Sequence, residues 1–308
     1  MRYRPLGRTG LTVSELGFGC ASWWGRPALP ERTALGLVHE AIERGVTLFD
    51  TGASYSAGAA EPRLGRALQG RDRSRLVIAT KAGTLHAGGG RIVRDMSPQG
   101  IVASAERSLR NLGLERIDLL QLHGPATGEL TDALQAALAA LKDRGRVRAV
   151  GLNSFDPAVI EHALSLEVFD VVMIDYSVLR TEREGLIARA AAAGKGVLAG
   201  APLAMGATRP LLSRLRGPRD LWYAARAVAH HRQDVVRGLD FRFLHKLPTL
   251  TGSQAALAFV LANRNVSAAV FGATRFAHLR DNLAASDVVL GADLHAAIRA
   301  AQRRSDAT

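Results

Sequence analysis

The chain has 308 residues, long for one ordinary domain, and its 47% of apolar residues can fill a large α/β core. Its formal net charge is +12, but the 40 basic residues are dispersed with no basic run interleaved with aromatics, so composition gives no support for nucleic-acid binding. The single cysteine, Cys20, excludes an intramolecular disulfide, and no stretch approaches the ~18 apolar residues of a membrane span. We therefore expect a cytoplasmic protein with neither a membrane nor a nucleic-acid partner, either a monomer or a weak homo-oligomer.

Short aliphatic runs alternate with segments of helical period along the chain. Residues 1–14 predict a hairpin with its turn at Gly7–Gly10. Eight strands are then expected at 15–20, 47–50, 76–81, 117–123, 147–152, 171–175, 196–199 and 268–271. Helices are predicted at 30–45, 61–68, 98–113, 131–144, from 157 onward, at 182–193 and at 253–263, with one final helix after Gly272.

This alternation favours a closed, parallel (β/α)8 TIM barrel over a doubly wound sheet, in a single domain spanning residues 1–308. Residues 207–250, after the seventh strand, contain no clear strand and are too long for an ordinary loop, which indicates a functional flap. No strand–turn–helix carries the G-x-G-x-x-G fingerprint of the usual dinucleotide fold.

Three predicted strands end in side chains that can carry protons or charge: Asp50, Lys81 and His123. Tyr55 follows the first of these in a turn rich in glycine and serine. Because the strands of a parallel barrel end at one rim, we expect the four side chains to converge there. An acid, a phenol, an amine and an imidazole in one site form a proton-transfer device.

These motifs resemble the aldo-keto reductase superfamily over nearly the whole chain. The resemblance rests on Phe49–Ser56, Ala79–Lys81 and Leu120–Pro125, and it implies that Asp50, Tyr55, Lys81 and His123 form the family's catalytic tetrad. Residues 201–206 are most similar to the sugar-dehydrogenase branch that includes L-galactose dehydrogenase.

The resemblance also implies that NAD(P)H lies across the barrel rim. Gly272–Arg275 would cradle the adenosine phosphate at a helix N-terminus, and Asp281-Asn282 would meet the adenine. The other implied cofactor residues are Gly19, Cys20, Ala21, Asp50, Asn153, Ser154, Leu203 and His278, while Ala273 and Thr274 belong to the cradle.

The chain departs from the family pattern around the cofactor. It has Asn153-Ser154 for the usual Ser-Asn, Met173 for a glutamine, Gly200 for the tyrosine that stacks on nicotinamide, and Gly272 and His278 for a lysine and an arginine. Arg275, with no acidic residue between 272 and 280 to repel a 2′-phosphate, favours NADPH, and NADH stays open.

The expected reaction is reduction of an aldehyde or ketone. An ordinary tyrosine, with a pKa of about 10, is a poor acid at neutral pH, and we expect a cationic Lys81 to lower that pKa. Asp50 would hold Lys81, His123 would orient the carbonyl oxygen, and Trp24 would line the substrate pocket with Tyr55 and His123. No metal is expected, because His230-His231 lacks further ligands.

Three other functions are also compatible with this sequence. The enzyme could run in the oxidative direction on a sugar lactol. Lys81 could instead form a Schiff base in a lyase. The barrel could also be catalytically quiet and bind a nucleotide for regulation.

Overall fold

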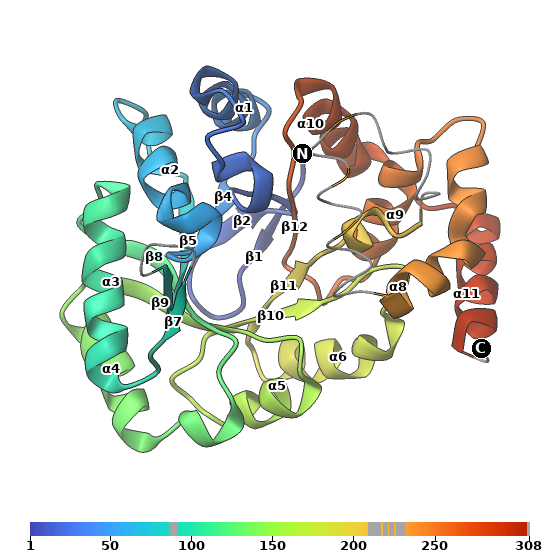
Figure 1. Cartoon of the computed structure of the whole chain (residues 1–308). Coiled ribbons are helices and arrows are strands. Elements are labelled where there is room, and N and C mark those ends of the chain that lie inside the picture. Colours follow the sequence, from blue (N-terminus) through green and yellow to red (C-terminus); the bar gives the residue numbers. More distant parts are fainter. Residues whose placement is uncertain (87–90, 209–216, 218–220, 222–224, 226–231, 307–308) are drawn as a thin grey trace.

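The computed structural model describes residues 1–86, 91–208, 217, 221, 225 and 232–306. Eight parallel strands close into a barrel, and helices surround it (Figure 1), which confirms the predicted (β/α)8 architecture. The barrel closes where Phe271 of the last strand lies beside Phe18 of the first. In order around the barrel, the strands are β10 (Val171–Asp175), β11 (Gly196–Gly200), β12 (Ala268–Phe271), β3 (Leu16–Gly19), β4 (Leu48–Asp50), β5 (Val77–Ala82), β8 (Ile117–His123) and β9 (Val147–Asn153).

The helices begin and end largely where the sequence signals predict. Ser97 caps α3 by accepting a hydrogen bond from the Gly100 amide at 3.0 Å, and Gly113 ends that helix with φ of 65°. The helices are α1 (Glu31–Glu43), α2 (Ala60–Leu68), α3 (Pro98–Leu112), α4 (Asp132–Asp143), α5 (Pro157–Leu164), α6 (Glu184–Ala192), α8 (Arg232–Arg237), α9 (Gly252–Ala262), α10 (Phe276–Leu283) and α11 (Ala292–Asp306). Among the helices described, none has the length and apolarity needed to cross a bilayer.

Two features differ from the sequence expectations. The single final helix is wrong: a 3-10 turn at Ala284–Asp287 and the stretch up to Gly291 separate α10 from α11. A small hairpin, β6 (Thr84–His86) with β7 (Ile92–Arg94), was not predicted, because strands of three residues are too short to show a period. The described part of the 207–250 segment holds α8 and a 3-10 segment at Gly238–Lys246, while Trp222, Tyr223, His230 and His231 lie outside the described residues.

The barrel interior is closed at the amino-terminal ends of its strands. The predicted hairpin is present, as β1 (Tyr3–Pro5) paired with β2 (Thr12–Ser14). Its side chains Leu6, Leu11 and Val13 join one apolar cluster with strand residues such as Leu48, Val77, Leu119 and Leu198. The hairpin thus seals one end of the barrel, and the carboxyl ends of the strands at the opposite end are free to form a site.

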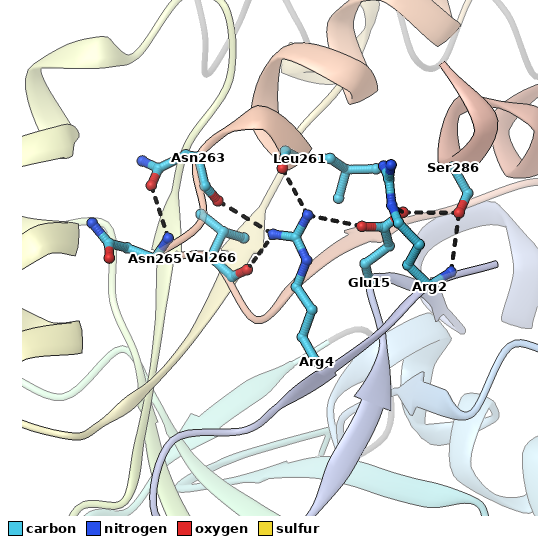
Figure 2. A network of polar contacts seen from close by, with 8 residues as sticks. All are labelled: Arg2, Arg4, Glu15, Leu261, Asn263, Asn265, Val266 and Ser286. Carbon is cyan, nitrogen blue, oxygen red and sulfur yellow. Dashed lines mark hydrogen bonds and ion pairs between the residues drawn. The ribbon is translucent and has the colours of Figure 1, made fainter. Parts of the chain in front are cut away.

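A buried polar network joins this hairpin to the seam between β3 and β12 (Figure 2). Glu15 is fully buried, and its carboxylate accepts hydrogen bonds from Arg2 Nε and Arg4 Nη2, both at 2.8 Å, and from Ser286 Oγ at 2.8 Å. Arg4 also donates to the carbonyl oxygen of Leu261, in the last turn of α9, at 2.7 Å, and to those of Asn263 and Val266, just after α9, at 3.3 and 2.8 Å. The network fixes the chain on both sides of the closing seam.

Candidate active site

The structure brings the four predicted catalytic residues together at the carboxyl ends of adjacent strands. Asp50 ends β4, Lys81 is the next-to-last residue of β5, and His123 ends β8. Alternation along each strand turns these three side chains inward, on the same face as Leu48, Val77 and Leu119. Because β4, β5 and β8 are neighbours in the barrel, three segments far apart in sequence share one small volume.

Lys81 is buried and held by two oxygens. Its Nζ donates to Asp50 Oδ2 at 2.5 Å and to the Thr51 carbonyl oxygen at 3.0 Å, and its side chain is 1% exposed. The side chain of Asp50 is 5% exposed, so both members of the ion pair are withdrawn from water. An ion pair this well enclosed has a fixed geometry, because either ion without its partner would be costly to bury.

Tyr55 lies directly against this pair. The Lys81 Nζ is 4.9 Å from the centroid of the Tyr55 ring, and the His123 ring meets Tyr55 edge to face with 5.5 Å between centroids. After Tyr55 the backbone turns sharply, with positive φ at Ser56, Ala57 and Gly58. Ser56 Oγ donates to the Ser22 carbonyl oxygen at 2.7 Å, which ties this turn to the loop after β3.

The charges in the site follow from burial and from these neighbours. Burial by itself would lower the pKa of Lys81, but the Asp50 carboxylate and Tyr55 outweigh it and raise that pKa, so Lys81 is an ammonium at neutral pH. Burial, assisted by the Lys81 charge, lowers the pKa of His123 to about 4. His123 is therefore a neutral imidazole, and its buried Nδ1 has no hydrogen-bond partner among the described residues.

Sequence reasoning missed a further residue of this cluster, Gln121 of β8. Its side chain is fully buried, and its Nε2 donates to Asp50 Oδ1 at 2.9 Å. A polar residue two positions before His123 points to the same side of the strand, which was the available signal. In the sequence it is one of two polar residues, with Asp118, among the aliphatic residues that precede His123 in this strand.

The implied cofactor residues lie mostly at the same rim. Gly19 and Gly272 follow the inward-facing pattern at the ends of neighbouring strands, and a Cβ on Gly272 would be 3.6 Å from the Gly19 carbonyl oxygen. Asn153 ends β9 beside His123, and the Ser154 amide donates to the Met173 carbonyl oxygen at 3.2 Å. Ala21 and Leu203 are half-buried.

The segment before and at the start of α10 contains both exposed and buried residues. Gly272, Arg275 and His278 are exposed, Thr274 is half-buried, and Ala273 is buried. Asp281 accepts hydrogen bonds from Thr251 Oγ1 and Gln254 Nε2, both at 3.0 Å, and Asn282 is 4% exposed. Asp281 is therefore hydrogen-bonded to the two residues that form the capping box of α9, and the Asn282 side chain is largely buried.

An aromatic ring lies beside Gly200, the position where the family pattern has the tyrosine that stacks on nicotinamide. A Cβ on Gly200 would be 3.3 Å from Phe155 Cε1 and 3.5 Å from Met173 Cγ. Phe155 follows β9 and is 47% exposed, whereas Met173 is 4% exposed. The space beside Gly200 therefore holds the edge of the Phe155 ring.

Trp24 and Cys20, two of the predicted site residues, belong to the larger hydrophobic cluster of the core. Trp24 is 1% exposed, and its indole Nε1 donates to the Ala34 carbonyl oxygen at 3.1 Å, so the ring packs in the core instead of lining a substrate pocket. An indole just past a strand end can face either the rim or the helical layer, and this hydrogen bond to α1 places it in the layer. Cys20 is fully buried, and its amide donates to the Asp50 carbonyl oxygen at 2.7 Å. Burial raises the pKa of its thiol well above the usual value, so it is not a nucleophile at neutral pH.

Comparison with known proteins agrees with this geometry. The model of the aldo/keto reductase family matches residues 15–303. An uncharacterized oxidoreductase of Bacillus subtilis (strain 168), YqkF, is 29% identical over 293 residues, which cover 93% of this chain and 92% of the relative. The NADH-specific methylglyoxal reductase of Escherichia coli (strain K12) is 27% identical over 316 residues, covering 94% of this chain and 95% of that protein.

A solved structure shares both the fold and part of the sequence. The holo form of the aldo-keto reductase AKR11C1 from Bacillus halodurans is similar with a TM-score of 0.81 and 29% sequence identity, covering 98% of this chain and 96% of that one. The chain therefore belongs to the aldo/keto reductase family and is an NAD(P)H-dependent oxidoreductase that acts on carbonyl compounds.

Proposed function

We propose that this chain uses NADPH to reduce an aldehyde or a ketone, and that Tyr55 delivers the proton to the carbonyl oxygen. The observation that carries the proposal is the buried Lys81–Asp50 ion pair, whose ammonium lies 4.9 Å from the Tyr55 ring centroid. A cation at this position stabilises the phenolate that remains after the proton has left.

The other side chains have complementary parts in this reaction. Asp50 balances the charge of Lys81 and so keeps the ammonium in place. The neutral imidazole of His123 has a nitrogen hydrogen with which to orient the substrate oxygen, because its pKa of about 4 leaves it unprotonated at neutral pH. Tyr55 is half-buried, and we expect its hydroxyl to face the substrate at the rim.

The residues at the rim fit a dinucleotide. Gly19 and Gly272 bring two backbones to the strand ends without side chains between them, and Gly272 and Arg275 are exposed where α10 begins. Backbone amides at a helix start, with a guanidinium beside them, suit a phosphate. When bound, the nicotinamide supplies the hydride, and Arg275 is the residue that we expect to meet a 2′-phosphate.

The choice between cofactors is open to a direct test, since the relative from Escherichia coli is named as NADH-specific. The purified protein is assayed with NADPH and NADH in parallel, over aldehydes, ketones and 2-oxoaldehydes such as methylglyoxal. Lactols with NADP⁺ test the oxidative direction implied by residues 201–206. We expect higher kcat/KM with NADPH, and Arg275→Met is expected to reduce that preference; equal or better turnover with NADH contradicts the cofactor assignment.

Replacement of the proposed proton donor gives the sharpest result. Tyr55→Phe is expected to lower kcat by roughly 10²–10³-fold, the usual cost of losing a donor to a developing oxyanion. Tyr3→Phe is the matched control, because that hydroxyl donates only to the Gly45 carbonyl oxygen on the surface. Cofactor binding, followed by quenching of tryptophan fluorescence, should persist in both variants. Near-normal turnover of Tyr55→Phe would exclude this role.

The Schiff-base alternative is disfavoured by the state of Lys81. An amine must lose its proton to attack a carbonyl, yet the Lys81 Nζ is protonated and donates to Asp50 and Thr51. Borohydride should therefore trap no substrate on the protein. A covalent adduct on Lys81 would support the lyase, and cofactor binding without any turnover would support the regulatory barrel.

A further inference from the structure

Gln121 is a buried polar residue in contact with the tetrad that has no part in the proposed reaction. It lies on β8 in register with Lys81 of β5 and Gly151 of β9, so its side chain enters the barrel in the same layer as the lysine. The side chain is fully buried. Its place is therefore inside the barrel, directly beneath the rim.

The neighbouring strand leaves room for this side chain. A Cβ on Gly151 would be 3.0 Å from Gln121 Cγ and 3.2 Å from the Val171 carbonyl oxygen. Any larger residue at 151 would push against the glutamine. The glycine thus accommodates Gln121 at the height where it meets Asp50.

The two oxygens of Asp50 each receive one side-chain donor. Oδ2 accepts from Lys81 Nζ at 2.5 Å and Oδ1 accepts from Gln121 Nε2 at 2.9 Å. The amide orientation follows from the chemistry, since only its NH₂ group can donate to a carboxylate. Gln121 Oε1, by contrast, is buried with no partner in the described part of the chain. A buried acceptor without a partner calls for an explanation, and the hydrogen bond from the same amide to Asp50 offers one.

We infer that Gln121 is a positioning residue of the active site, which fixes the Asp50 carboxylate so that Lys81 stays against the Tyr55 ring. This inference rests on the proposed function, because it concerns the same proton-transfer site. Without the amide, Asp50 Oδ1 becomes a buried, unpaired oxygen, and the carboxylate can rotate away from Lys81. Its negative charge then acts on Tyr55 without compensation, and the phenolate is harder to form.

Two variants of similar size separate this role from simple packing. Gln121→Met keeps the volume and removes the donor. Gln121→Glu restores a donor only while the new carboxyl is protonated, and when ionised it places a second negative charge beside Asp50. The charged and titratable groups around position 121 are Asp50 from β4, Lys81 from β5, His123 from β8, Tyr55 from the turn after β4, and Cys20 after β3.

In Gln121→Met we expect kcat to fall about 10–100-fold, as for the loss of one hydrogen bond to a buried charge, with KM for the carbonyl substrate nearly unchanged. The kcat/KM profile should shift toward higher pH. Gln121→Glu should keep more activity at low pH and lose it as the pH rises, because its donor is lost on ionisation. Gln302→Met is the matched control: this buried glutamine donates to the Val178 carbonyl oxygen far along the chain from the tetrad, and its loss should leave the profile in place.

A second readout does not depend on turnover. Ultraviolet difference titration of each protein against its own Tyr55→Phe partner reports the pH at which Tyr55 ionises. Gln121→Met should raise that midpoint by about one pH unit, a tenfold change in the equilibrium. An unchanged midpoint together with unchanged kcat overturns the inference, whereas absence of NADPH-dependent activity in the unmodified protein, with a shifted midpoint, overturns only the proposed function.

Discussion

His123 lies in the candidate active site, and its lowered pKa makes the folded protein less stable at acidic pH. The imidazole is held neutral by burial and by the neighbouring Lys81, with a pKa of about 4 against 6.5 in an unfolded chain. Below pH 6.5 the unfolded chain therefore takes up a proton that the folded protein refuses. The stability contributed by this group is complete above pH 6.5 and is lost as the pH falls toward about 4.

The stability lost on acidification can be measured. A difference of 6.5 against about 4 corresponds to roughly 3 kcal/mol of unfolding free energy between pH 7 and pH 4. Urea denaturation of the wild type and of His123→Asn at both pH values should show that the variant loses less stability by about this amount. The exposed His162 supplies the control, since His162→Asn should follow the wild type. Parallel curves for all three proteins would mean that His123 titrates as it does in the unfolded chain.

At the scale of single residues, the sequence was most informative where a side chain ends a strand. Asp50, Lys81 and His123 were predicted together because barrel topology gathers such ends at one rim. Gln121 escaped because its partner, Asp50, lies 71 positions away, and no local pattern indicates which buried polar side chains will meet. Trp24 was misread for a related reason, since its partner is a carbonyl oxygen of a helix that the sequence does not orient.

Among the elements, the N-terminal hairpin approaches the barrel closely. Gly7 has φ of 56°, and a Cβ there would lie 2.2 Å from the Gly196 amide nitrogen where β11 begins. Gly10, in the same turn, has φ of 69°, but a Cβ there would meet nothing within 4 Å. Both positions need a left-handed backbone, and Gly7 alone also needs the absence of a side chain.

We expect alanine to destabilise the protein more at position 7 than at position 10. Gly10→Ala should destabilise the protein by about 1–2 kcal/mol, the cost of a left-handed backbone for a residue with a side chain. Gly7→Ala should cost about 1–3 kcal/mol more, because the hairpin must also move off the barrel. Chemical denaturation of the two variants measures the difference. Equal losses would show that the hairpin does not press on β11.

Elements with an aliphatic run, a helical period or a clear turn signal were predictable, and elements without one were not. The strand Ile117–His123 and the strand Val171–Asp175 have the predicted bounds, since buried parallel strands read as aliphatic runs. The hairpin of β6 and β7 and the break between α10 and α11 lack such a signal. Both depend on contacts between distant parts of the chain.

The whole molecule depends on closing a circle between its first and last strands. Arg4 is central to this closure, since it binds Glu15 and three carbonyl oxygens in the last turn of α9 and just after it (Figure 2). Arg4→Met would leave the carboxylate of Glu15, fully buried, with one of its two cations. We expect a loss of about 3–5 kcal/mol, as for breaking a buried ion pair from one side.

An exposed pair provides the comparison. Arg66 and Glu31 form an ion pair with side chains 50% and 45% exposed. Arg66→Met should cost at most about 1 kcal/mol, because water and salt screen such pairs. Thermal or urea unfolding of both variants distinguishes the two cases. Similar small losses would indicate that Arg4 does not contribute to closure.

The seam between β3 and β12 also has a consequence for synthesis of the chain. Asp50, Tyr55, Lys81 and His123 all leave the ribosome long before residues 268–271 are made. Until then the first barrel strand has no partner on one side, and its open backbone can pair with another nascent chain. About the last eighth of the polypeptide therefore completes the barrel, and we expect a chain truncated before β12 to carry the catalytic groups yet to be prone to aggregate.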